Sequence, residues 1–213
     1  MTETDPPSTA ASPRPNTTDP RPRFDTAIAT VMDLVETVTP ADLERPTPCD
    51  EYDVRALLGH MLTVLRRPAA LATGADAMAF PDFVSGVADD AWGATFAADR
   101  DTVLTAWADD AVLDREMALP WVQGPGRRML PTYTSELTVH TWDLARALDA
   151  TPAWDDEVVA EALAVSALML PDGERETMVL PNGMAIPFAS AVEVAADAAP
   201  IDRLVGWYGR TPA

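Results

Sequence analysis

The sequence predicts a mainly α-helical protein, a bundle of four main helices with a small C-terminal α/β appendage. Three observations predict this class. Apolar residues recur every three or four positions through several long segments, as on the buried face of an amphipathic helix. Apolar residues make up 47% of the chain, which suffices for a continuous core. After residue 170 the helical spacing gives way to short apolar runs around Asn182-Gly183, a hairpin signal.

The first two helices are predicted on either side of a proline-rich connection. Residues 1–22 are rich in Pro, Thr, Ser and Asp, and we expect them to form a disordered extension. The first helix begins near Phe24 and is closed by Thr39-Pro40. The second helix is capped by Asp53, carries a buried apolar stripe and stops at Gly74.

The remaining elements follow from the same spacing. Residues 74–96 predict a looser excursion, and a helix is expected over 99–117. A loop or short strand pair precedes Pro131, which suits the first turn of the next helix. The later elements expected are a helix over 155–170, short strands at 178–180 and 186–188, and a final helix over 201–208. We therefore expect an extension (1–22), a metal-binding bundle (23–170) and an appendage packed on it (171–213).

Composition and charge narrow the possible functions. The formal net charge is −19, and all 15 basic residues are arginine. Such an acidic surface would be repelled by a phosphate backbone, so we expect no nucleic-acid partner. The single cysteine excludes an intrachain disulfide. Neither a secretory signal nor the roughly 18 apolar residues of a membrane span are visible. We expect a soluble cytoplasmic protein without a membrane partner.

The chain has two histidines, and both are predicted to lie near the bundle interior. His140 follows Glu136 by four residues, so the two side chains share one helix face. His60 lies in the second helix, beside its apolar stripe. Two imidazoles and a carboxylate from two helices are typical of a catalytic divalent-metal site with an open position. The alternative is that each histidine is only a core or rim residue.

The metal and its surroundings stay open at this stage. Zinc is the first choice for two histidines and a glutamate, although nickel, iron or manganese would accept the same ligands. Asp143 follows His140 by three residues. It either orients an imidazole as a hydrogen-bond acceptor behind the ligand or is an ordinary solvated acid.

Two segments carry a resemblance to a known family. TPCDEYDVRALLGHML (residues 47–62) and ELTVHTWDLARAL (residues 136–148) resemble the actinobacterial family related to mycothiol-dependent maleylpyruvate isomerase, within the DinB-like bundle superfamily. The resemblance covers roughly residues 24–212. It implies that the metal ligands are His60, Glu136 and His140. Cys49 belongs to the first motif, and we interpret it as a small packed residue.

The resemblance also implies thiol chemistry at a metal. A low-molecular-weight thiol such as mycothiol, bound as thiolate, would attack a small electrophilic metabolite, giving an S-conjugate or an isomer. This chain departs from the family at Tyr52, where tryptophan is frequent. It also departs in its N-terminal extension and in its short C-terminal segment, which weakens any transfer of maleylpyruvate as the substrate.

Other interpretations remain. Metal-bound water would give a hydrolase or lyase, although no general base is clearly placed for it. A non-catalytic bundle that binds a metal or small molecule is a further alternative, as is a metal-free structural bundle. Arg55, Arg127 and Arg128 are candidates to hold a substrate carboxylate, or else are solvated surface residues. The expected partners are a small-molecule substrate and a thiol, with the protein a monomer or homodimer.

Overall fold

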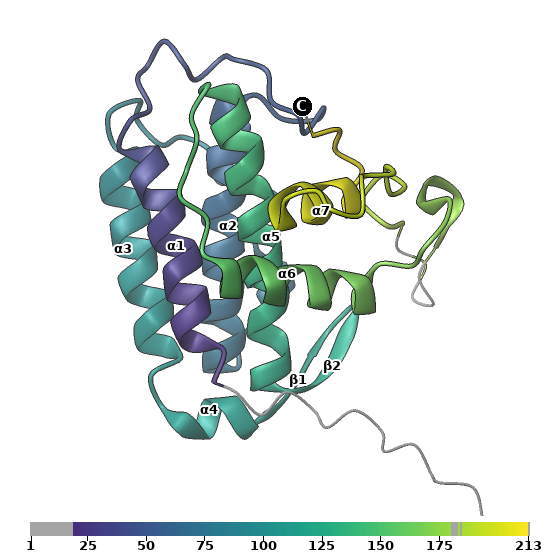
Figure 1. Cartoon of the computed structure of the whole chain (residues 1–213). Helices are drawn as coiled ribbons and strands as arrows, with labels where there is room; N and C mark the ends of the chain where they lie inside the picture. The colour runs from purple at the N-terminus through teal and green to yellow at the C-terminus, as the bar shows by residue number, and fades with distance from the viewer. Residues whose placement is uncertain (1–18, 180–182, 184, 213) are drawn as a thin grey trace, which may run out of the picture.

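The computed structural model describes residues 19–179, 183 and 185–212, and it is mainly helical (Figure 1). Four helices lie side by side as a bundle: α1 (Arg21–Val35), α2 (Val54–Thr73), α3 (Trp92–Ala106) and α5 (Gly126–Ala147). The predicted fold class is thereby confirmed. No helix in the described part of the chain has both the length and the apolar character needed to span a bilayer.

Helices α1 and α2 begin and end close to where their sequence signals indicate. Helix α1 has Pro22 in its first turn, which is the position that proline tolerates best, so it starts within the last residues of the predicted extension. Residues 1–18 of that extension lie outside the described residues. The Asp53 side chain accepts a hydrogen bond from the Ala56 amide, and Gly74 ends α2 in a left-handed conformation with φ of 80°.

The predicted third helix, over 99–117, is wrong in both of its boundaries. Helix α3 begins at Trp92 and ends at Ala106, and a separate helix α4 (Asp110–Asp114) follows. The Asp109 side chain accepts a hydrogen bond from the Ala111 amide, so it caps a new helix where the prediction continued the old one. A short 3₁₀ turn, η1 (Ala77–Ala79), lies in the excursion before α3.

A β-hairpin connects α4 to α5. Strands β1 (Glu116–Leu119) and β2 (Val122–Pro125) pair antiparallel, with Glu116 opposite Pro125. Helix α5 starts directly after β2, at Gly126, whereas the sequence predicted its first turn at Pro131. Pro131 lies inside the helix, where its missing N–H removes one backbone hydrogen bond near the N-terminal end without ending the helix.

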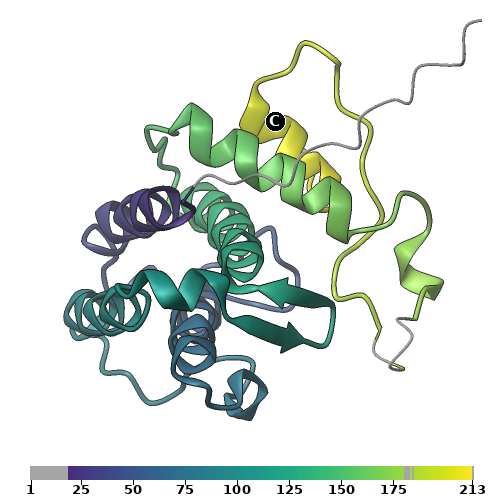
Figure 2. The same cartoon turned by 90° about the horizontal axis from the view of Figure 1, so that it is seen from below.

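The last helices form a second layer on the bundle. Helix α6 (Asp156–Met169) runs crosswise to the bundle helices, and α7 (Pro200–Trp207) lies beside it against α5 (Figures 1 and 2). They share an apolar cluster made of Val139, Trp142, Val159, Ala162, Ile201, Leu204, Val205 and Tyr208. Helix α6 packs with both α5 and α7, and so it contacts elements on each side of the division predicted at residue 170. That division stays a prediction.

The predicted C-terminal hairpin is not formed as a pair of strands in the described residues. Val179 and Ala185 make one isolated bridge, and residues 180–182 and 184 of the predicted hairpin lie outside the description. The predicted strand at 186–188 is irregular. A 3₁₀ turn, η2 (Arg175–Thr177), precedes the predicted pair, and its Glu176 carboxylate accepts a hydrogen bond from the Ser190 amide just beyond the second predicted strand. The two segments are thus joined there by a side-chain bond instead of a backbone ladder.

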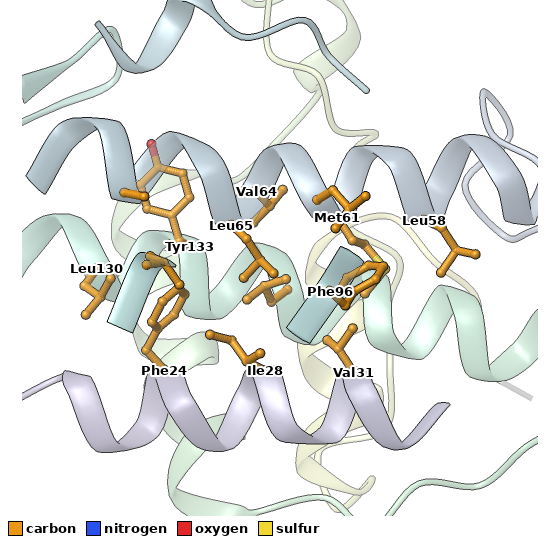
Figure 3. Packing of buried hydrophobic residues seen from close by; sticks show 14 of the residues in the cluster. Phe24, Ile28, Val31, Leu58, Met61, Val64, Leu65, Phe96, Leu130 and Tyr133 are labelled. Atoms are coloured by element: carbon orange, nitrogen blue, oxygen red, sulfur yellow. The ribbon is translucent and has the colours of Figure 1, made fainter. Parts of the chain in front are cut away.

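The main core fills the space between α1, α2, α3 and α5. Phe24, Ile28 and Val31 of α1 face Met61 and Leu65 of α2 across this interior (Figure 3). All of these side chains are buried. This apolar packing fixes α2 and α5 against each other, and therefore fixes the relative positions of the polar groups these two helices carry.

Candidate metal centre

His60 is held on α2 by a loop that passes close to the helix. The residue before it is Gly59, whose carbonyl oxygen accepts a hydrogen bond of 2.9 Å from the Val84 amide. This approach brings the Asp82 carbonyl oxygen within 2.7 Å of His60 Nδ1. A carbonyl oxygen can only accept, so Nδ1 carries the proton and donates. The Nε2 atom is left to face the interior of the bundle.

Helix α5 supplies the other two groups. Glu136 and His140 are four residues apart and lie on one face of the helix, as their spacing predicts. His140 is 3% exposed, and its Nδ1 lies 3.0 Å from Asp143 Oδ2. Arg210 in turn donates to both Asp143 oxygens, with Nε at 3.1 Å and Nη2 at 2.8 Å. Asp143 is fully buried and orients the His140 ring from behind.

The structure brings His60, Glu136 and His140 together. The distance from His60 Nε2 to Glu136 Oε1 is 3.3 Å, and the two imidazole rings lie 4.7 Å apart at 82°. One ligand atom from each of the three residues lies within 4.8 Å of the other two. Zinc ligands at 2.0–2.2 Å in a tetrahedron are separated by roughly 3.4 Å, so small side-chain adjustments would suffice for a shared ion. The donor set fits a divalent cation.

The three donors have interdependent protonation. Burial alone would lower the pKa of His60, but the hydrogen bond and charge of Glu136 outweigh burial and raise it. Burial would likewise raise the pKa of Glu136, yet His60 and the neighbouring charges lower it. Burial lowers the pKa of His140, against the opposing effect of Asp143. The carboxylate is therefore ionised and His140 is neutral, which are the forms that bind a metal.

A cavity of about 610 Å³ opens beside the three donors. The excursion before α3 contributes Met78 and Asp82 to its lining, and the β1–β2 turn contributes Trp121. The C-terminal segment closes another side with Phe188 and Tyr208. The cavity is large enough for two small molecules, or for one thiol cofactor with an electrophile next to it.

Cys49 also lines this cavity and is half-buried. Its sulfur and one ligand atom each of His140 and Asp143 lie within 4.8 Å of one another. Both Asp143 oxygens are already engaged by Arg210 and His140, so this second grouping offers fewer free lone pairs than the first. Burial raises the pKa of the Cys49 thiol, which favours its neutral form.

The arginines proposed from the sequence lie elsewhere. Arg55 pairs with Asp89 at 2.6 Å on the surface, Arg127 pairs with Asp114, and Arg128 packs against Gly124. None of these three lines the cavity. The cavity arginines are Arg67 and Arg210, which sequence reasoning missed. Arg67 follows His60 by seven residues, two helical turns on the same face, and that spacing was an available signal.

Three hydroxyl groups form a buried cluster in the same wall. Ser135 Oγ lies 2.7 Å from Ser166 Oγ and 2.9 Å from the Tyr208 hydroxyl. Both serines also donate to the Ala162 carbonyl oxygen. The cluster joins α5, α6 and the end of α7, and so it fixes the C-terminal segment against the cavity.

Fold and donor set together define a class, namely helical bundles that carry a candidate divalent-metal site between two helices. Comparison with known families places the chain within this class. Residues 24–145, more than half of the chain, match the family described as mycothiol maleylpyruvate isomerase N-terminal domain. The chain belongs to this family, which is mycothiol-related and metal-binding and falls in the DinB-like helical superfamily. The resemblance stated from the two sequence segments is thus confirmed.

Relatives add little about function. Two curated proteins of Mycobacterium tuberculosis, from strains CDC 1551 and H37Rv, are each named as uncharacterized. Each is 25% identical over 179 residues, which are 84% of this chain and 90% of the relative. No solved structure gives a significant match. All three donors lie inside the region matched by the family, whereas Arg210 and Tyr208 lie outside it.

Proposed function

We propose that the protein is a metal-dependent enzyme that uses a low-molecular-weight thiol, mycothiol or a close analogue, for S-transfer to a small electrophile or for its isomerisation. One observation carries the proposal. Two imidazoles and a carboxylate converge at the wall of a cavity of about 610 Å³, in a chain of the mycothiol-related family. A divalent cation at this place, zinc being the first choice, lowers the pKa of a coordinated thiol.

The chain's own residues prepare the site for that chemistry. The Asp82 carbonyl and the Asp143 carboxylate each accept an Nδ1–H, so Nε2 is the atom of each imidazole that would bind the metal. His60 Nε2 would first give up the proton that it shares with Glu136. Arg210 fixes Asp143 through two hydrogen bonds. The cavity has room for an electrophile beside the thiol, and such an arrangement would supply proximity.

Metal content is the first test of the proposal. Protein purified without a histidine tag and reloaded with Zn²⁺ should hold about one ion per chain by elemental analysis. His60→Ala and Glu136→Ala should lose it, while Glu157→Ala, an exposed glutamate at the start of α6, should keep it. Equal metal content in all four proteins would remove the basis of the proposal.

Thiol consumption is the second test. Metal-loaded protein should accelerate the reaction of mycothiol with 1-chloro-2,4-dinitrobenzene, and chelation should abolish the acceleration. The Glu136→Ala variant should match the chelated protein, and Glu157→Ala should match the wild type. Metal binding without any thiol consumption, across a panel of electrophiles, would favour the non-catalytic bundle instead.

Use of bound water in place of a thiol is less well supported. A hydrolase needs a general base near the water. Among the described residues that line the cavity, the carboxylates other than Glu136 are Asp50, Glu51 and Asp82, and all three are exposed at its mouth. Asp143, behind His140, is already paired with Arg210. The thiol mechanism requires no such base.

A further inference from the structure

Arg67 is a buried cation whose hydrogen bonds are incomplete. It lies on α2, and its side chain is only 10% exposed. One terminal nitrogen, Nη2, lies 3.3 Å from the Phe80 carbonyl oxygen and 3.2 Å from Asp82 Oδ1. The Asp82 side chain is 83% exposed, so its charge is largely screened by water. Arg67 Nε is buried and finds no hydrogen-bond partner among the described residues.

Arg67 lines the cavity described above, whereas Tyr133, whose buried hydroxyl also lacks a partner in the described part of the chain, does not. A buried donor without a partner costs free energy, and native proteins leave few of them. The incompletely bonded Arg67 side chain at the cavity wall therefore indicates that something else completes it.

Charges in the cavity wall show what kind of group would do so. Asp143 and Arg210 neutralise each other as a buried pair. The carboxylates of Asp50, Glu51 and Asp82 also line the cavity, but all three are exposed and screened by water. Arg67 is therefore a cavity-lining cation for which the described residues provide no buried carboxylate, and an anionic group on a ligand would supply that charge.

We infer that Arg67 is a specificity-determining residue that binds a carboxylate on the electrophile. That the bound molecule is the electrophile rests on the proposed function. The anion site itself rests on the burial and contacts of Arg67 among the described residues. Guanidinium groups bind carboxylates through paired N–H donors. A neutral ligand would leave the buried Arg67 guanidinium without a negative charge in the cavity. The site should therefore bind a carboxylate more tightly than its neutral ester.

The test measures binding in the absence of thiol. Isothermal calorimetry on Zn²⁺-loaded protein compares monomethyl succinate, which carries one carboxylate, with dimethyl succinate, its neutral diester. We expect the wild type to bind the monoester at least about 10-fold more tightly, the scale of one charge-assisted hydrogen bond. Arg67→Gln should lose this preference. The matched control is Arg66→Gln, which removes the neighbouring arginine that pairs with Asp99 at 2.6 Å, and it should retain the preference.

Three results would overturn the inference. The first is wild-type protein that binds both esters equally. The second is Arg67→Gln protein that keeps the preference, because the carboxylate would then be recognised by the metal alone. Should Arg67→Gln fail to fold, Arg67→Lys keeps the charge but loses Nε–H, and an undiminished preference in that variant is the third. None of these measurements uses thiol, so a failure of thiol consumption leaves the anion site intact, and the reverse is also true.

Discussion

Replacing Gly59 with alanine tests how the loop before α3 positions His60. A Cβ atom at residue 59 would lie closer than 3.0 Å to the Val84 carbonyl oxygen, a separation that real Cβ atoms essentially never show. The obstacle is backbone, so the loop itself must move. That movement would disturb the 2.9 Å bond from the Val84 amide to the Gly59 oxygen and the 2.7 Å contact of Asp82 with His60.

The expected magnitude is a balance of two effects. Alanine in a helix is better than glycine by up to about 1 kcal/mol. Against this, overpacking costs ~1–3 kcal/mol, and a lost hydrogen bond costs about 1 kcal/mol more. Gly59→Ala should therefore lower the free energy of unfolding by roughly 1–3 kcal/mol. Because the hydrogen-bond acceptor behind His60 would be displaced, metal affinity should fall about 10–100-fold.

The matched control is Gly93→Ala. A Cβ atom at this position in α3 has no heavy atom within 4 Å, so only the helix preference acts. The free energy of unfolding should stay unchanged or rise by up to about 1 kcal/mol. Urea unfolding and competition with a metal chelator measure the two quantities. If Gly59→Ala matched Gly93→Ala in both, the loop would not be what holds His60 in place.

Three further outcomes are expected. Burial raises the pKa of all three tyrosines, that of Tyr52 to about 12, so absorbance at 295 nm should show no phenolate near pH 10 in the folded protein. The folded state then keeps protons that the unfolded state loses, so stability should decline as the pH rises above about 10; an ordinary phenol titration near pH 10 would contradict this. Asp53→Ala should cost about 1 kcal/mol in urea unfolding through loss of the α2 cap, and no change would show that the cap contributes nothing. Arg210→Gln should reduce metal affinity by about 10-fold, because Asp143 would lose two hydrogen bonds and hold His140 less firmly, whereas affinity equal to that of the wild type would show that this orientation is unimportant.

The helical periodicity predicted most of the bundle, because the buried faces of α1, α2 and α5 repeat every three to four residues. Both ends of the third helix and the start of α5 were missed, and two of these three boundaries can be traced to particular residues. Helix α3 ends where Asp109 caps a new helix, and a competing cap is hard to recognise inside an apolar repeat. Helix α5 starts before Pro131, because proline is tolerated in the first turns of a helix more widely than its preferred position indicates.

The sequence likewise predicted only part of the candidate site. Glu136 and His140 share a helix, so their spacing alone places them together. Pairing them with His60 needed the assumption that α2 and α5 face each other, which the bundle packing now supplies. Arg210 could not be placed from the sequence, since its contact with Asp143 spans 67 residues and depends on how α7 docks. Arg67 carried a usable signal, its two-turn spacing from His60, but a lone arginine in an apolar helix resembles many surface arginines.

The contact of Arg210 with Asp143 has a consequence for how relatives can diverge. The three donors belong to the region that defines the family, whereas the guanidinium that steadies one of them comes from a segment outside it. Exchanging that segment would retune the basicity of His140 and reshape the cavity wall while leaving the bundle's interior untouched. One helical scaffold with the same three donors can in this way be given differently shaped cavities by its C-terminal segment.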